Sequence, residues 1–201
     1  MIRNIIFDVG KVLVEFDWEK AFHELGFDGE TFERVADATV RSKAWDELDR
    51  SSLSDKEQLL AFIKNAPEYE KEIKLLWENI GRCIWQYDYA MDFVKTLKKN
   101  GYHTYILSNY GRYTRECTLE ALSFEKEMDG VVFSYQIQAI KPEPEIYQEL
   151  LTRYHLDPDE CVFLDDRQVN LDEANRQGIH TILFQGYEQA CEKLRALGVQ
   201  I

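Results

Sequence analysis

Four short stretches of the sequence carry the side chains that could do chemistry, and each follows an apolar run typical of a buried strand. They are residues 8–13, 107–109, 140–147 and 163–166. The carboxyl ends of neighbouring parallel strands meet at one edge of an α/β sheet, where ligands usually bind. We therefore expect the polar side chains of these stretches to converge on one site.

The three aspartates Asp8, Asp165 and Asp166 indicate a metal site. Carboxylates at short range do not all stay ionised without a nearby cation. A set of oxygen ligands favours Mg²⁺, which keeps several waters and combines one or two carboxylates with a phosphate oxygen. The cofactor predicted from the sequence is therefore Mg²⁺.

Ser108 and Lys141 indicate that the ligand is an anion. Ser108 offers a hydroxyl donor, and the backbone amides after it can hold an oxyanion. Lys141 adds a positive charge beside Pro142, at the start of a predicted helix whose N-terminus also favours anions. An aspartate nucleophile, a hard metal and convergent donors together predict phosphoryl transfer through an aspartyl-phosphate. Each residue alone has an ordinary explanation as a turn, cap or solvated side chain, and their joint occurrence in this order favours the site.

The elements that position these residues follow the pattern of an α/β fold. Short apolar runs, typical of strands covered on both faces, lie at 4–8, 105–107, 131–133, 161–164 and 181–184. Helical patterns separate the later strands at 90–99, 144–154 and 171–177, and the last ends at Gly178, a predicted C-terminal cap. This alternation predicts a doubly wound parallel sheet of about five strands.

Residues 15–87 interrupt the alternation and contain no segment that reads as a strand. Helical patterns cover 19–25, 31–43, 55–65 and 68–80, and Ser54 with Glu57 forms a capping box at the third. We expect a core made of residues 1–14 and 88–201, with 15–87 as an inserted α-helical cap domain. Because the insertion begins soon after Asp8, it is placed to cover the site.

The composition limits the possible binding partners of the protein and the cellular compartment in which it is expected to work. The chain has 201 residues and a net charge of −13, which argues against nucleic acid or an anionic membrane as the main partner. No apolar run approaches the ~18 residues of a membrane span, and the N-terminus lacks the pattern of a signal peptide. Four scattered cysteines without a C-x-x-C favour reduced thiols. We expect a cytoplasmic protein that acts on a small phosphorylated metabolite; the sequence carries no signal for its oligomeric state.

The four stretches resemble motifs I to IV of the haloacid dehalogenase superfamily of phosphohydrolases. The resemblance covers the whole chain, and residues 15–87 look like the type 1 cap of that family. Within it, the chain is most similar to the α-D-glucose-1-phosphate phosphatases and to the phosphatase domain of epoxide hydrolases. The stretch from Trp45 to Ser54 adds a weaker likeness to that subgroup. The resemblance implies a Rossmann-like core and hydrolase activity.

The resemblance also implies roles for the motif residues. Asp8 would be the nucleophile, and Lys141 would neutralise the phosphoryl group and orient Asp8. The implied phosphate-binding residues are Ser108, Asn109 and Lys141. The implied metal ligands are Asp8, the backbone carbonyl of Gly10, Asp166 directly and Asp165 directly or through water, with Asn170 supporting the metal shell.

Position 10 departs from the family pattern, in which a second aspartate normally stands two residues after the nucleophile. That aspartate protonates the leaving group and then activates water, help that is typically worth about 10²–10⁴ in rate. Gly10 keeps the carbonyl for the metal but has no proton to give.

Three explanations of Gly10 stay open. Another group supplies the proton: a metal-bound water, Glu15, Asp17 or a cap residue such as Asp49. Alternatively, turnover is limited to esters with good leaving groups, or the protein is a weakened enzyme that binds or regulates. A haloacid dehalogenase is a separate alternative, because it also lacks the second aspartate, but the Asp165–Asp166 pair argues against it.

Substrate choice is expected to depend on the cap. Trp45 and Asp49 are predicted substrate-binding residues, with Trp18 and Arg50 as further candidates. The nearby cations Lys11, Arg112 and Arg167 read as solvated side chains.

Overall fold

A parallel five-stranded sheet with the order β5–β4–β1–β6–β7 forms the centre of the fold. The computed structural model describes every residue from Met1 to Ile201. The sheet strands are β1 (Asn4–Phe7), β4 (His103–Ser108), β5 (Gly130–Phe133), β6 (Cys161–Asp165) and β7 (His180–Leu183). All five predicted strands are present, and the predicted doubly wound parallel sheet is confirmed.

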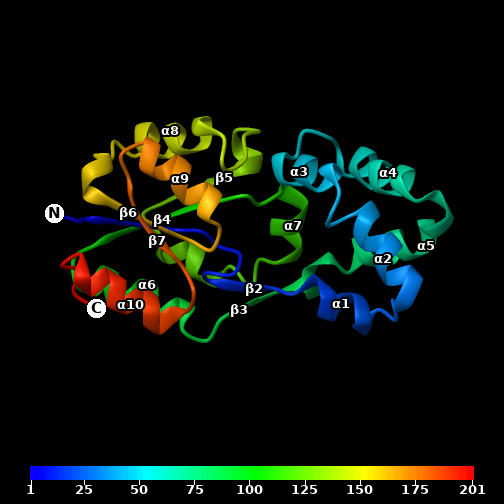
Figure 1. Ribbon diagram of the computed structural model, residues 1–201, viewed down its shortest axis with the longest axis horizontal. Helices are drawn as coiled ribbons and strands as arrows, with labels where there is room; N and C mark the ends of the chain where they lie inside the picture. The colour runs from blue at the N-terminus through cyan, green and yellow to red at the C-terminus, as the bar shows by residue number, and fades with distance from the viewer.

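Helices cover both faces of this sheet (Figure 1). On one face lie α6 (Ala90–Lys99) and α10 (Tyr187–Ala196), and on the other α8 (Pro144–Arg153) and α9 (Gln168–Arg176). Side chains of β1 alternate between the two layers, as a strand requires. Phe7 packs edge-on against Phe93 of α6, with ring centroids 5.2 Å apart, whereas Ile6 joins the opposite cluster around Tyr147.

The sheet order brings the predicted motif residues together. β1 pairs in parallel with β4 on one side and β6 on the other, and Phe7 lies opposite both Ile106 and Leu164. The residues that end the three strands therefore lie side by side at one edge of the sheet. Asp8, Ser108 and Asp165 reach this edge from segments far apart in the sequence.

Several predicted helix boundaries match the structure. α6 has the predicted bounds, and Gly178 follows α9 with a φ of +85°, the left-handed conformation that glycine adopts without a steric penalty. The predicted capping box is present, with Ser54 and Glu57 each accepting a hydrogen bond from the backbone of the other. α9 begins three residues earlier than the pattern predicted.

The helices of residues 15–87 gather at one end of the molecule, away from most of the sheet (Figure 1). They are α1 (Trp18–Glu24), α2 (Gly29–Ala38), α3 (Lys43–Arg50), α4 (Asp55–Asn65) and α5 (Glu70–Glu78). α7 (Arg112–Cys117) lies between this group and the sheet. Short 3₁₀ helices occupy Pro67–Tyr69, Ile80–Cys83, Ser123–Glu127, Ser134–Gln136 and Pro158–Glu160. None of the helices combines the length and apolarity needed to cross a membrane.

The expectation that residues 15–87 contain no strand is wrong. β2 (Val14–Phe16) and β3 (Ile84–Gln86) form an antiparallel pair at the two ends of the segment. Each strand has three residues, too few to show an alternating pattern. Their pairing joins residues about 70 positions apart, so it depends on tertiary structure rather than on local propensity.

The predicted helix over 31–43 is also wrong in its second half. α2 ends at Ala38, and α3 begins at Lys43. Between them, the Thr39 hydroxyl donates to the Val35 carbonyl at 2.6 Å, and the Ser42 hydroxyl donates to the Thr39 carbonyl at 2.7 Å. Such side-chain hydrogen bonds compete with the helical ladder, which explains the break.

α3 is fastened to the core by polar contacts and by close packing. Arg50 forms an ion pair with Glu143, and Nη1 of Arg50 donates to Oε2 of Glu143 at 2.7 Å. The Ser134 hydroxyl donates to the Asp49 carbonyl at 2.6 Å. Gly111 lets the backbone of α3 approach, because a Cβ there would overlap the carbonyl oxygen of Leu48.

We expect Gly111→Ala to lower the free energy of unfolding by about 1–3 kcal/mol, because the added methyl group meets a backbone carbonyl that cannot rotate away. Gly10→Ala is the control, since a Cβ at Gly10 meets no atom within 4 Å. It should change the free energy of unfolding by less than about 0.5 kcal/mol. Urea denaturation of both variants measures the difference, and equal effects would contradict the close packing at Gly111.

Candidate active site

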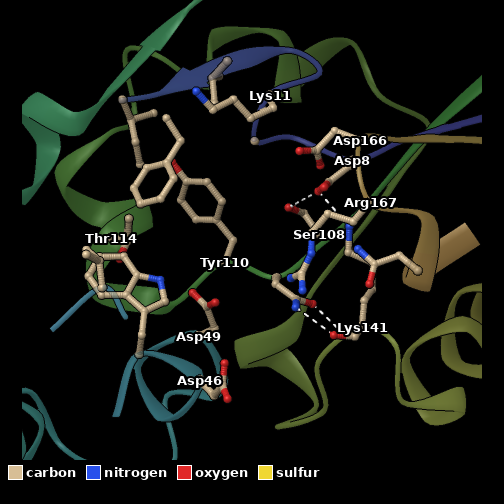
Figure 2. Close-up of a pocket in the computed structure, with 18 of the residues that line it drawn as sticks. Asp8, Lys11, Asp46, Asp49, Ser108, Tyr110, Thr114, Lys141, Asp166 and Arg167 are labelled. Atoms are coloured by element: carbon tan, nitrogen blue, oxygen red, sulfur yellow. Dashed lines mark hydrogen bonds and ion pairs between the residues drawn. The ribbon is translucent and has the colours of Figure 1, made fainter. Parts of the chain in front are cut away.

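A cavity of about 470 Å³ opens at the carboxyl edge of the sheet, between the strand ends and the helices of residues 15–87. The strand ends contribute Asp8, Ser108 and Asp166, and the loop before α8 contributes Lys141. α3 contributes Trp45 and Asp49 from the opposite side. Figure 2 shows Asp8, Ser108, Lys141, Asp166 and Asp49 around the cavity.

Asp8 is held by one of its two carboxylate oxygens. Its Oδ1 accepts from the Ser108 hydroxyl at 2.7 Å and lies 2.9 Å from Nζ of Lys141. Oδ2 has no hydrogen-bond partner in the protein. Burial raises the pKa of Asp8 to about 7, although the charge of Lys141 opposes this effect. The arrangement leaves one oxygen of a fixed carboxylate free for a ligand.

Lys141 lies between two buried carboxylates. Its side chain is 1% exposed, and its Nζ is 2.6 Å from Asp165 and 2.9 Å from Asp8. Burial acts to lower the pKa of Lys141, but the charges of Asp165 and Asp8 outweigh it, so the pKa is raised. Lys141 therefore carries its positive charge at neutral pH.

Asp165 and Asp166 differ in how their carboxylates are used. Asp165 is fully buried and accepts from Lys141 at 2.6 Å, from the Arg167 backbone amide at 2.8 Å and from the Asn170 side chain at 3.0 Å. Asp166 is half-buried and has no hydrogen-bond partner in the protein. Burial and the charge of Asp165 raise the pKa of Asp166. Asp166 is thus the carboxylate of this pair that is free to bind a cation.

The side chain of Asn109 does not point a donor into the cavity. Its amide oxygen accepts from the Lys141 backbone amide at 2.6 Å, and its amide nitrogen donates to the Lys141 carbonyl at 3.1 Å. Asn109 thereby fastens the loop that carries Lys141. The backbone amides of Gly10 and Asn109 have no acceptor in the protein, so these amides are available to an anion.

The donor set fits Mg²⁺. Oxygen atoms of Asp8, Asp165 and Asp166 lie within 4.8 Å of one another. The Gly10 carbonyl accepts no hydrogen bond, and Oδ1 of Asn170 is buried without a partner. A buried oxygen is costly without a partner, and hard oxygen ligands are those that Mg²⁺ prefers.

Asp49 places a further carboxyl group on the cavity wall. The side chain is half-buried, lines the cavity and has no hydrogen-bond partner. Burial raises the pKa of Asp49 to about 7, and the negative charges of Asp46 and Asp8 add to the effect. An unpaired carboxyl group with this pKa is able to give and take a proton near neutral pH.

The other cap candidates divide into two groups. Trp45 lines the cavity beside Phe16, with ring centroids 5.9 Å apart. Trp18 is not part of the cavity wall and packs in the aromatic cluster of α1 and α2, and Arg50 is bound to Glu143.

Of the three nearby cations, two reach the cavity. Lys11 and Arg167 line its wall. Arg112 instead pairs with Asp55 and Glu116.

Thr114 and Tyr110 also line the cavity, but neither was predicted from the sequence. The Thr114 hydroxyl is buried and has no partner, so it is available to a ligand. The Tyr110 hydroxyl is 2.8 Å from the Thr118 hydroxyl. Tyr110 directly follows Asn109 and could have been found from that position, whereas Thr114 lies on a short helix that no pattern predicted.

Comparison with known proteins defines the class of this chain. Residues 2–178 match the family model described as hydrolase: haloacid dehalogenase-like hydrolase. The chain belongs to this family of hydrolases, and the resemblance of its four motifs to that family is confirmed.

Among individual proteins, the chain is similar to D-ribitol-5-phosphate phosphatase of Bacteroides thetaiotaomicron. The two are 30% identical over 199 residues, which cover 90% of this chain and 91% of the relative.

Two solved structures share the fold. One is a predicted haloacid dehalogenase-like hydrolase of Porphyromonas gingivalis, with 23% identity, a TM-score of 0.75 and 100% of both chains covered. The other is a haloacid dehalogenase family enzyme of Bacteroides thetaiotaomicron in complex with magnesium and inorganic phosphate. It has 22% identity and a TM-score of 0.72, and the match covers 90% of this chain and 93% of that one.

We expect Lys141→Met to lower the free energy of unfolding at pH 7 by about 3–5 kcal/mol, because it leaves two buried carboxylates without their counter-ion. Lys98→Met is the matched control: it removes a 2.8 Å ion pair with Asp129 whose side chains are 32% and 30% exposed. The control should cost at most about 1 kcal/mol. Similar losses for the two variants, measured by chemical denaturation, would contradict this account of the buried cluster.

The raised pKa of Asp49 predicts a pH-dependent cost to stability. With a pKa of about 7 in the folded chain and about 3.9 when unfolded, the neutral group favours folding below about pH 4. That contribution is lost as the pH rises through about 7. We expect Asp49→Asn to raise the free energy of unfolding at pH 8 by about 1–2 kcal/mol. This is below the ~4 kcal/mol of the full shift, because the group keeps some water.

Chemical denaturation at pH 5 and pH 8, with EDTA present, measures this effect. The gain should be smaller at pH 5. Glu47→Gln serves as the control, since Glu47 lies on the same helix, does not line the cavity and pairs with Ser52. If the gain in the free energy of unfolding were no larger at pH 8 than at pH 5, this would contradict the raised pKa of Asp49.

Proposed function

We propose that this protein is a Mg²⁺-dependent phosphatase that hydrolyses a small phosphorylated metabolite through an aspartyl-phosphate on Asp8. One observation carries the proposal: Asp8 is fixed through Oδ1 by Ser108 and Lys141, while its Oδ2 is unpaired and the Asp166 carboxylate lies close to that of Asp8. A carboxylate fixed in this way is oriented for attack on phosphorus and needs little reorganisation.

The core residues have distinct roles in the proposed reaction. Oδ2 of Asp8 attacks phosphorus, and the bond to the leaving oxygen breaks. Lys141 and the backbone amides of Gly10 and Asn109 stabilise the negative charge on the transferring group. Ser108 contributes to phosphate binding by fixing the oxygen of Asp8 that does not react, and Asn109 by fixing the Lys141 loop.

The residues that would hold Mg²⁺ are Asp8, the Gly10 carbonyl and Asp166, with Asp165 supporting the site and Asn170 offering its unpaired oxygen. The hydrogen bonds that Asp165 already accepts favour contact with the metal through water over direct binding. When bound, Mg²⁺ offsets the negative charge of the carboxylates and polarises the phosphoryl oxygens. The structure of the related enzyme with magnesium and inorganic phosphate supports this assignment.

We also propose that residues 15–87 act as a cap over a core made of 1–14 and 88–201. The cavity walls support this division, since Asp8 and Lys141 come from one part and Trp45 and Asp49 from the other. An aromatic wall with a free hydroxyl at Thr114 suits a small ester with an aliphatic, hydroxyl-bearing leaving group. The relative that acts on D-ribitol 5-phosphate supports a sugar or sugar-alcohol phosphate as the substrate class.

Dehalogenation is the second candidate, and Gly10 is the observation that favours it. Against it stands the cluster of three carboxylates, because that reaction needs no metal and gains nothing from Asp166. Fold similarity does not separate the two activities, since a dehalogenase is also among the structural neighbours, with 19% identity and a TM-score of 0.69.

The decisive experiment measures phosphate release from a panel of sugar and sugar-alcohol phosphates with excess Mg²⁺ and with excess EDTA. We expect turnover only with Mg²⁺. Asp8→Asn should lower it by at least about 10³-fold, because the amide cannot form the acyl phosphate. Asp88→Asn is the control, since Asp88 is exposed and lies outside the cavity.

Undiminished activity in EDTA would contradict the metal requirement. Chloride release from 2-chloropropionate without phosphatase activity would favour the dehalogenase. Binding of Mg²⁺ and phosphate without turnover on any ester would favour a binding or regulatory protein.

A further inference from the structure

Because residue 10 is glycine, it supplies neither the acid nor the base that the proposed reaction needs. The alkoxide that leaves during attack by Asp8 needs a proton, and the water that later attacks phosphorus must lose one. Steric crowding does not explain the glycine at this position, since a Cβ at Gly10 would meet no atom within 4 Å. The proton must therefore come from another group that reaches the cavity.

The core side of the cavity offers no free proton donor. Lys141 is held between two carboxylates, Lys11 is paired with Glu15, and the Tyr110 hydroxyl is paired with Thr118. Asp166 belongs to the proposed metal site. No histidine is among the residues that line the cavity.

Glu15 and Asp17, which the sequence left open, are engaged elsewhere. Glu15 accepts from the Tyr87 hydroxyl at 2.8 Å and from the Phe16 backbone amide at 2.9 Å, and it pairs with Lys11. Asp17 accepts from the Lys20 backbone amide at 2.9 Å, as the N-cap of α1. Neither carboxylate lines the cavity.

Asp49 has the position that this role requires. It lies on the cap side of the cavity, across from the strand tips that carry Asp8 (Figure 2). An in-line displacement puts the leaving oxygen on the side of phosphorus opposite to Asp8, hence toward the cap. The carboxyl group is half-buried and unpaired, and the other cap carboxylate on the cavity wall, Asp46, is exposed.

The backbone around Asp49 is fixed from both sides. Its carbonyl accepts from the Ser134 hydroxyl at 2.6 Å, and the next residue, Arg50, is paired with Glu143. The preceding residue, Leu48, is buried where the chain passes over Gly111. Three consecutive residues are thus tied to the core, and Asp49 is the one whose side chain is left free.

Resting on the proposed phosphatase activity, we infer that Asp49 is the general acid and base of the reaction and takes the place of the aspartate absent at position 10. In the first step the neutral Asp49 carboxyl gives its proton to the leaving oxygen as the bond from phosphorus to that oxygen breaks, which releases an alcohol. In the second step the Asp49 carboxylate takes a proton from a water whose oxygen attacks phosphorus. Asp8 leaves as a carboxylate, inorganic phosphate is formed and Asp49 is again neutral.

The electrostatic surroundings agree with this role. The charged groups that bear on Asp49 are the carboxylates Asp46 and Asp8, which disfavour its ionisation, and the cations Lys141 and Arg167, which favour it. Together with burial they hold both protonation states within reach of neutral pH, as a group that acts first as acid and then as base requires.

The test compares two esters under single-turnover conditions with Mg²⁺. One is p-nitrophenyl phosphate, whose leaving group needs no proton, and the other is the alkyl phosphate that the wild type hydrolyses best. We expect Asp49→Asn to slow release of the alcohol by about 10²–10⁴-fold, but release of p-nitrophenol by less than about tenfold. Phosphate release should then lag behind p-nitrophenol, because the aspartyl-phosphate awaits a base.

Two further variants sharpen the test. Glu47→Gln, on the same helix but outside the cavity, should leave both rates unchanged. Gly10→Asp in the Asp49→Asn background should restore alcohol release at least about tenfold, since the added side chain has space.

Three results would overturn the inference: equal losses on the two esters, weaker binding of the ester with the single-turnover rate at saturation unchanged, or no loss at all. The second of these would make Asp49 a residue that binds the substrate. These failures are distinct from failure of the proposed function, which would appear as undiminished activity of Asp8→Asn.

Discussion

The buried ion pairs of Lys141 with Asp8 and Asp165 are the interaction on which the rest of the site depends. Charges removed from water are costly unless they are paired closely and hydrogen-bonded, and within the protein their attraction is correspondingly stronger. The fold meets this condition from four segments: three adjacent strand ends, and a loop that the side chain of Asn109 fastens. The same pairing fixes one oxygen of Asp8 and leaves the other open. In the proposed reaction, the geometry that stabilises the charges therefore also sets the direction of attack.

In the proposed function, the helices of residues 15–87 complete the site chemically as well as sterically. The core supplies anion-binding groups and oxygen ligands, but no free proton donor. α3 supplies Asp49, and the aromatic rings of Phe16 and Trp45 narrow the cavity around it. The attachment of α3 through Arg50 and Ser134 holds this carboxyl group in place. Its raised pKa is a cost in stability that the folded chain bears at neutral pH, as is common where function requires an unfavourable local environment.

The sequence predicted the parts of the structure that depend on local pattern. The five apolar strands and the polar residues that follow them were found because burial on both faces leaves a continuous apolar run. β2 and β3 were missed because three residues show no period, and their pairing is a long-range event. The helix break at Thr39 depends on side-chain hydrogen bonds such as that from the Thr39 hydroxyl to the Val35 carbonyl. The helical propensity of the sequence does not reveal these bonds, so the break could not be predicted.

Within the site, the residues themselves were easier to predict than the hydrogen-bond partners of their side chains. The sequence placed Asn109 at the phosphate, but its side chain is used by the Lys141 backbone. It also left a metal-bound water, Glu15, Asp17 and Asp49 open as sources of the proton. Glu15 is excluded because Tyr87, 72 positions away, donates a hydrogen bond to it, and Asp17 is excluded because it caps α1. Neither relation can be read from a motif.

The central position of β1 has a consequence for how the chain is made. Both of its neighbours in the sheet are synthesised much later than β1 itself: β4 begins at His103 and β6 at Cys161. Until then the apolar run of β1 has no partner, and pairing over such separations is slow and open to aggregation. The apolar run of β1 therefore stays unpaired on one side until β6 has been synthesised, and a chain truncated before β6 lacks both Asp165 and Asp166. The site therefore forms only after β6 has been synthesised and has paired with β1.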